Sequence, residues 1–235
     1  DTAGNQNSLS NTYSWTHDTT APTISISGPS TTITNSGPVT YTITYSGANA
    51  VTLAAGNVTL TATGNAAGSM AVSGSGTSTR TVTISSITGD GTLKITIASG
   101  TASDTAGNSA AGAGPSGTFT VDNTGPTMTL SSATVSNGGS HNSTVTVTFT
   151  SNESTTNFVS GDVTVTNGSL GALSGSGTTY TGTVTASGQG AVTVKVLANK
   201  FTDTAGNQNS LSNTYSWTHD SVAPTVSISN PSASL

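Results

Sequence analysis

Six of the nine acidic residues lie in two short motifs that each occur three times. The first motif is the pentapeptide DTAGN, which starts at Asp1, Asp104 and Asp203. The second is an aspartate followed by a Pro-Thr pair and an alternating apolar run, and it starts at Asp18, Asp122 and Asp220. Only 6% of residues are charged, against about 25% in ordinary domains, so this clustering predicts a specific role for the six carboxylates.

Two kinds of chemistry fit an aspartate that opens a glycine-containing loop. Its carboxylate can accept backbone N–H groups of the loop in an Asx-turn, with Gly107 and Gly206 supplying a positive φ. Alternatively, carboxylate and amide oxygens are the ligands that Ca²⁺ prefers, and Asp104 with Asn108, or Asp203 with Asn207, would offer them. The residues by themselves favour the Asx-turn.

The other acidic residues are weaker candidates. Asp162 begins an expected strand and is interpreted as facing water, with metal ligation as a less favoured alternative. Glu153 and Asp90 are predicted to be solvated.

No pattern for catalysis is present. His17 and His219 are copies of one position and His141 follows a glycine pair, so the histidines form neither a hydrolase triad nor a zinc site. No G-x-S-x-G elbow joins a strand to a helix, and the acids recur along the chain instead of pairing as a glycosidase requires. We therefore expect no enzyme, no catalytic residue and no organic cofactor.

The composition excludes several classes of binding partner and structural framework. The basic residues number only four against a net charge of −5, so a nucleic-acid partner is not expected. No apolar run approaches the ~20 residues of a membrane span. Without cysteine there is no disulfide framework. The sequence starts inside a motif without a signal peptide, and we interpret it as part of a longer chain.

The motifs recur with a period of about 100 residues, and the eighteen residues Asp1–Asp18 return unchanged as Asp203–Asp220. This predicts a closing strand of one repeat in 1–18, a first domain in 19–122, a second in 123–220 and the opening strand of a further repeat in 221–235. The identity of the two segments suggests that the larger unit is a pair of domains.

Within each repeat the pattern is that of short strands. Val39, Tyr41, Ile43 and Tyr45 alternate with polar residues, as expected of a half-buried strand. Asp90-Gly91 is predicted to form a tight hairpin turn between two strands. The fold class is therefore all-β: tandem immunoglobulin-like antiparallel β-sandwiches, of about seven strands each, in a linear array. Pro22, Pro126 and Pro224 indicate edge strands.

Side chains on these strands follow from the same alternation. The closing aromatics Tyr13, Trp15, Tyr215 and Trp217 are predicted to fill sandwich cores, with a carbohydrate platform as the less favoured alternative. Lys94 and Lys195 fall on the outward phase, which argues against a buried lysine in an isopeptide bond.

Such a sandwich also constrains the acids. The loop before the last strand and the end of that strand lie at opposite poles, so a DTAGN loop is not expected to touch the exit aspartate of its own domain. An exit aspartate can instead meet a loop at the entrance of the following domain, and the sequence leaves open which loop this is.

The combination of DTAGN, a closing aromatic strand and an Asp-x-x-x-Pro-Thr opening resembles the bacterial Ig-like domains of large repetitive surface proteins and adhesins. The resemblance covers essentially the whole chain. It implies an extracellular stalk of serial β-sandwiches, with Ca²⁺ held at the junctions by acidic residues. The ligands implied here are Asp18, Asp104, Asn108, Asp122, Asp203, Asn207 and Asp220.

The leading hypothesis is thus a stalk segment of a long bacterial cell-surface protein, an adhesin, whose partners are neighbouring repeats of the same chain. A second hypothesis is a subunit of an extracellular fibre or sheath, in which an unpaired closing strand adds to the sheet edge of another copy. A third is a glycan-binding module that uses the aromatic residues.

Overall fold

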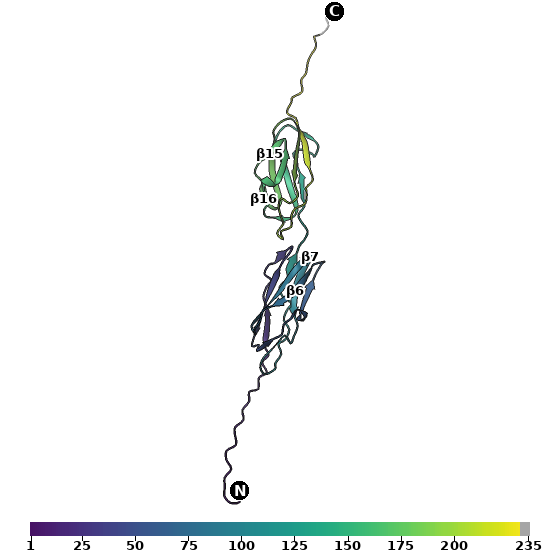
Figure 1. Cartoon of the computed structure of the whole chain (residues 1–235). Helices are drawn as coiled ribbons and strands as arrows, with labels where there is room; N and C mark the ends of the chain where they lie inside the picture. The colour runs from purple at the N-terminus through teal and green to yellow at the C-terminus, as the bar shows by residue number, and fades with distance from the viewer. Residues whose placement is uncertain (231–235) are drawn as a thin grey trace, which may run out of the picture. The chain divides into compact units, whose positions relative to one another are not determined.

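The computed structural model describes residues 1–230 and divides the chain into two compact units (Figure 1). The first unit comprises residues 1–32, 37–87 and 92–119. The second comprises the short segments 33–36 and 88–91 and the chain from Thr120 onward. Of the expected opening strand 221–235, the last five residues lie outside the described part of the chain.

Two four-stranded sheets form the first sandwich. One has the order β1 (Thr23–Ile26), β3 (Val39–Ser46), β7 (Thr79–Thr88), β6 (Ala67–Ser73). The other has the order β2 (Ile33–Thr34), β10 (Phe119–Val121), β8 (Gly91–Ile97), β5 (Val58–Ala62). A short ladder joins β4 (Ala50–Val51) to β9 (Ala102–Ser103), and a 3₁₀ turn, η1, spans Ala55–Asn57.

The second sandwich repeats this order. Its first sheet runs β11 (Met128–Ser131), β13 (Val145–Thr155), β16 (Ser174–Ala186), β15 (Gly168–Leu170). Its second sheet runs β12 (Ser140–His141), β18 (Tyr215–His219), β17 (Gly190–Val196), β14 (Val163–Thr166), and the 3₁₀ turn η2 spans Ser160–Asp162. The all-β, immunoglobulin-like fold class is confirmed.

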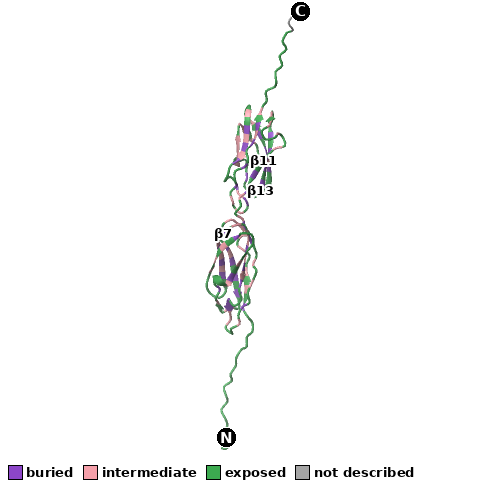
Figure 2. Ribbon diagram, turned by 90° about the vertical axis from the view of Figure 1, so that its right-hand side faces the viewer, coloured by how far each residue is buried: buried purple, intermediate pink, exposed green. Residues whose placement is uncertain are grey.

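Period-two alternation builds the cores, because every second side chain of a strand faces the opposite sheet. On β3, Val39, Tyr41 and Ile43 are fully buried. On β18, Tyr215 and Trp217 are buried against the core of the second sandwich, as predicted. In Figure 2 the buried residues fall on the strands of each sandwich, whereas the segments at both ends of the chain are exposed. Lys94 and Lys195 lie on the outward phase, between buried aliphatic residues.

The outer face of the first sheet in each sandwich is covered by threonine. In the first sandwich Thr40, Thr42 and Thr44 of β3 face Thr83, Thr81 and Thr79 of β7. In the second, Thr146, Thr148 and Thr150 of β13 face Thr183, Thr181 and Thr179 of β16. Such cross-strand pairs stabilise a sheet while keeping its solvent face polar without charge.

Two expectations need correction. The turn at Asp90-Gly91 is no hairpin, because β7 and β8 belong to opposite sheets and the turn crosses between them. Each sandwich also gains a two-residue strand, β2 or β12, that pairs in parallel with the closing strand. The strands expected in 1–18 and 221–235 belong to neighbouring repeats; within the described residues no sheet lies beside these segments, so both strands stay predictions.

Tyr13 (89% exposed) and Trp15 (73% exposed) lie in segment 1–18, beside which the described residues place no sheet, so their core placement stays a prediction. No helix within residues 1–230 is long and apolar enough to cross a membrane.

Candidate functional site

The DTAGN loop of the first unit is closed by its own aspartate. The Asp104 carboxylate accepts the backbone N–H of Asn108 at 2.8 Å and its side-chain amide at 2.8 Å. The Asn108 amide also donates to the backbone carbonyl of Asp18 at 3.0 Å. Gly107 allows the turn with φ of +92°. These donors, the Asn108 side chain above all, lower the pKa of Asp104 below its ordinary value.

The DTAGN loop of the second unit is built in the same way. Asp203 is buried and accepts the N–H groups of Gly206 at 2.7 Å and Asn207 at 2.9 Å, together with the Asn207 side-chain amide at 2.8 Å. That amide also donates to the backbone carbonyl of Asp122 at 2.8 Å. Asn35 donates to the Asn207 side-chain oxygen at 3.1 Å.

Both loops therefore contain the Asx-turn that the residues favoured, and each loop binds the aspartate that ends the preceding closing segment. The asparagine of the motif is the clamp, since one amide group holds both the loop carboxylate and the linker carbonyl. The exit aspartates use their own side chains to turn the linker. Asp18, Asp122 and Asp220 accept the N–H two residues ahead at 2.9, 3.0 and 3.0 Å.

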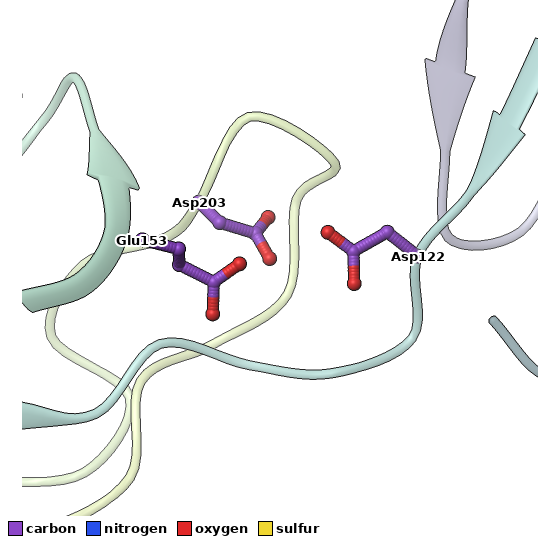
Figure 3. Close-up of side chains that lie close together, drawn as sticks. All are labelled: Asp122, Glu153 and Asp203. Carbon is purple, nitrogen blue, oxygen red and sulfur yellow. The ribbon is translucent and has the colours of Figure 1, made fainter. Parts of the chain in front are cut away.

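The second unit adds a group of three carboxylates to this loop. One oxygen each of Asp122, Glu153 and Asp203 lies within 4.8 Å of the others. Figure 3 shows the three carboxylates pointing toward one another. Glu153 comes from the far end of β13, where the ladder to β16 is irregular between Thr150 and Thr155. The linker after β10, the end of β13 and the DTAGN loop thus each bring one carboxylate to the same place.

The ionised form of the Glu153 side chain is in an unfavourable environment in this group. Its Oε1 is enclosed and has no hydrogen-bond partner among the described residues. Desolvation, followed by repulsion from Asp122 and Asp203, raises the pKa of Glu153 above its ordinary value. A buried acceptor without a donor, facing two further carboxylates, is the environment that a bound cation would relieve.

The prediction that Glu153 is solvated is wrong, because its Oε1 is enclosed. Asp90 is exposed to solvent, as predicted, but it also has a structural role. Asp90 accepts the Asn123 N–H at 2.7 Å and the Thr124 hydroxyl at 3.2 Å, so it holds the linker that follows Asp122. Glu153 is the one glutamate of the chain, and this rarity was the signal that sequence reasoning did not use. Asp162 accepts the Val159 N–H at 2.9 Å across η2 and takes no part in the carboxylate group.

The other predicted ligands are not brought into a comparable group. In the first unit Asp18 and Asp104 meet through Asn108, but the register places Gly47 where the second unit has Glu153. Asp220 lines a polar hollow of about 250 Å³ with Ser140, His141 and Asn142. The described residues place no second carboxylate beside it in that hollow.

The second unit matches a known family in its sequence. The profile of a bacterial Ig-like domain matches residues 122–218. Among solved structures, InvD of Yersinia pseudotuberculosis aligns at 16% identity and a TM-score of 0.39, over 89% of this chain and 60% of that one. The D0-D1 domain of intimin aligns at 17% identity and a TM-score of 0.23, over 83% of this chain and 96% of that one. No match was found among curated proteins.

Proposed function

We propose that this chain is a stalk segment of a bacterial cell-surface protein of the adhesin type, because residues 122–218 match the bacterial Ig-like domain family. In this proposal the chain acts outside the cell as a structural spacer, and its partners are neighbouring repeats. The segment binds Ca²⁺ in the second unit. Its role is mechanical, and no residue has a catalytic task.

The observation that carries the calcium proposal is the group Asp122, Glu153 and Asp203. The side-chain ligands that this group offers are all carboxylate oxygens, which Ca²⁺ prefers. Zinc sites typically use nitrogen and sulfur ligands instead. The enclosed Oε1 of Glu153 supports the fit, because it lacks any other partner in the described structure. Backbone carbonyls and water would complete the coordination. Asn207 would position Asp203 and the Asp122 backbone through the bonds already formed.

A cation at this point would restrict the linker that starts at Asp122. The linker runs only from Asp122 to Pro126, and Pro fixes one of its dihedral angles. Asp90 and Asn207 already hold its first residues by hydrogen bonds. Ligation of Asp122 would remove further freedom at the start of the linker, which is the property that a spacer requires.

The experiment is thermal unfolding of the full chain in Ca²⁺ and in chelator, with Trp217 emission as the probe of the second unit. Trp217 is 2% exposed, whereas Trp15 is exposed before and after unfolding. Calcium at about ten to a hundred times the Kd should stabilise the second unit by about 1–3 kcal/mol. The control variant Glu153→Gln should lose this gain, and Mg²⁺ should not replace Ca²⁺.

An unchanged midpoint in the wild-type chain would remove the calcium site. The spacer function has a separate readout, the maximum dimension of the chain in small-angle scattering. A broad distribution of dimensions that calcium does not narrow would count against the spacer role, even if calcium binds.

A further inference from the structure

The two histidines of the second sandwich lie side by side on neighbouring strands. β12 pairs in parallel with β18, and the register places His141 directly opposite His219. Register partners point to the same face of a sheet, and neighbouring strands lie about 4.8 Å apart, so both imidazoles can reach one ion between them. Their separation in the sequence hides this pair, because β12 and β18 are the second and the last strand of the sandwich.

The first sandwich has no histidine at either of these positions. There β10 pairs with β2, and Val121 lies opposite Thr34. The positions are equivalent, since the exit aspartate donates its backbone N–H to Thr34 in the first sandwich and to His141 in the second, at 3.1 Å in both. Val121 is 1% exposed, so it belongs to the core. The second sandwich therefore has an imidazole in place of a core valine, and a second imidazole at the register partner.

The place of His219 is unfavourable for an imidazole without a ligand. His219 shares the inward face of β18 with Trp217, and its Nδ1 is enclosed without a hydrogen-bond partner among the described residues. A buried polar atom without a partner needs an explanation in a native structure, and a bound ion is one. On the other side of β18 the register partner of His219 is Gly190, which has no side chain and borders open space. That space gives room for an ion.

We propose that His141 and His219 together bind one divalent transition-metal ion of the kind that prefers imidazole, such as Zn²⁺. Neutral imidazole nitrogens are among the usual ligands of Zn²⁺ and Cu²⁺, whereas Ca²⁺ takes oxygen ligands. Asp220 lines the same polar hollow as His141, so its carboxylate would be the third ligand, and water would complete the coordination. This site is separate from the proposed calcium site and does not depend on it.

The ion would fasten the end of the closing strand. β12 has only two residues, and its carbonyl at His141 accepts the backbone N–H of Asp220, where the exit linker begins. A metal bridge between the two rings adds a second link at the same rung, so this end of the strand pair would open less often. Both strands and Gly190 belong to the sandwich itself, and the pair therefore exists whatever follows Asp220.

The first test is calorimetric titration of the full chain with Zn²⁺ in excess Ca²⁺. We expect one Zn²⁺ per chain. The variants His141→Thr and His219→Val give the second sandwich the residues that the first sandwich holds, so the fold accommodates them. Each should weaken Zn²⁺ binding at least about 100-fold, because loss of even an outer partner of a metal ligand costs about 10- to 100-fold in affinity.

Two matched variants serve as controls. His17→Gln removes the one histidine outside both sandwiches, and Glu153→Gln alters the proposed calcium site; both should bind Zn²⁺ as the wild-type chain does. Loss of Zn²⁺ binding in either control contradicts the proposal. So does an absence of Zn²⁺ binding to the wild-type chain, or wild-type affinity in His141→Thr or His219→Val. Two ions per chain, of which each histidine variant removes one, would show that the imidazoles bind separately.

A second test locates the ion through tryptophan emission. Trp217 lies two residues from His219 on the same face of β18, and Trp15→Phe leaves it as the one tryptophan of the chain. Cu²⁺ binds nitrogen sites more tightly than Zn²⁺, and as a paramagnetic ion it should quench the emission of the nearby Trp217. In Trp15→Phe/His141→Thr the same quenching should require at least about 100-fold more Cu²⁺, as for Zn²⁺. Equal quenching in the two chains would place the ion elsewhere and overturn the proposal.

Discussion

In the first unit the loop from Asp104 to Asn108, and in the second the loop from Asp203 to Asn207, close through the same carboxylate and the same asparagine. In each the asparagine also binds the carbonyl of the preceding exit aspartate. The two regions differ in what stands beside them. The second has Glu153 with its enclosed oxygen, and at the corresponding place the first has Gly47, which has φ of +78°.

This difference separates two roles of the DTAGN loop: holding the linker by hydrogen bonds, and contributing a carboxylate to the proposed cation site. Since both loops form their bonds without a third carboxylate, the DTAGN sequence is sufficient for a linker clamp. The third carboxylate of the proposed calcium site is that of Glu153, which lies outside both motifs. Under the calcium proposal, a repeat of this kind would keep the bonds of its DTAGN loop and gain or lose its metal site through a single residue at the end of a strand.

The comparison is tested most strongly at the clamp. Asn207→Ala removes bonds to Asp203 and Asp122 and leaves Asn35 without its acceptor, so we expect the second unit to lose about 1–2 kcal/mol of unfolding free energy. Asn108→Ala should cost the first unit about 1 kcal/mol, because its amide makes two bonds. Trp217 emission reports the second unit, and hydrogen exchange of β3 and β7 amides reports the first. A first unit unaffected by Asn108→Ala would break the equivalence of the loops.

A smaller effect of opposite sign is expected at Glu153. In chelator at neutral pH, Glu153→Gln removes repulsion with Asp122 and Asp203 and should stabilise the second unit by about 0.5 kcal/mol. Asp104→Asn is the contrasting variant, because the Asp104 carboxylate accepts bonds and its loss should lower the midpoint of the first unit. Denaturant unfolding of both variants decides the matter. Destabilisation by Glu153→Gln in chelator would show that Glu153 is satisfied without a cation.

The smallest expected effect is the change of unfolding free energy with pH. The contributions of Glu153 and Asp104 should change in opposite directions as pH rises. The pKa of Glu153 is raised, so in chelator its contribution favours folding when it is protonated and is lost as pH rises from 4.5 through the raised pKa. The pKa of Asp104 is lowered, so its contribution is present above 3.8 and is lost as pH falls through the lowered pKa. Unfolding midpoints between pH 3 and 7, with Glu153→Gln as reference, measure both slopes.

The sandwich fold was predictable because alternation alone identifies buried positions such as Tyr41 and Trp217. The two poles of a sandwich indicated that an exit aspartate can meet a loop of the following domain, but they did not identify that loop as DTAGN, because strand order and loop lengths at the entrance are not fixed by alternation. The sheet change at Asp90-Gly91 was not predictable, since turn residues do not specify which sheet the next strand joins. Glu153 was missed because it lies in the irregular end of β13, where period-two counting fails to give side-chain direction.

The Thr–Thr pairs on the outer face of the first sheet in each sandwich make the stability of these faces insensitive to salt. Ions screen charges over a Debye length of about 10 Å at 0.1 M, and hydroxyl groups offer them nothing to screen. Within the described residues, Asp122, Glu153 and Asp203 form a concentrated point of charge. We therefore expect sodium chloride to weaken the repulsion among these three carboxylates. The same salt should leave the stability of the threonine-covered sheet faces unchanged.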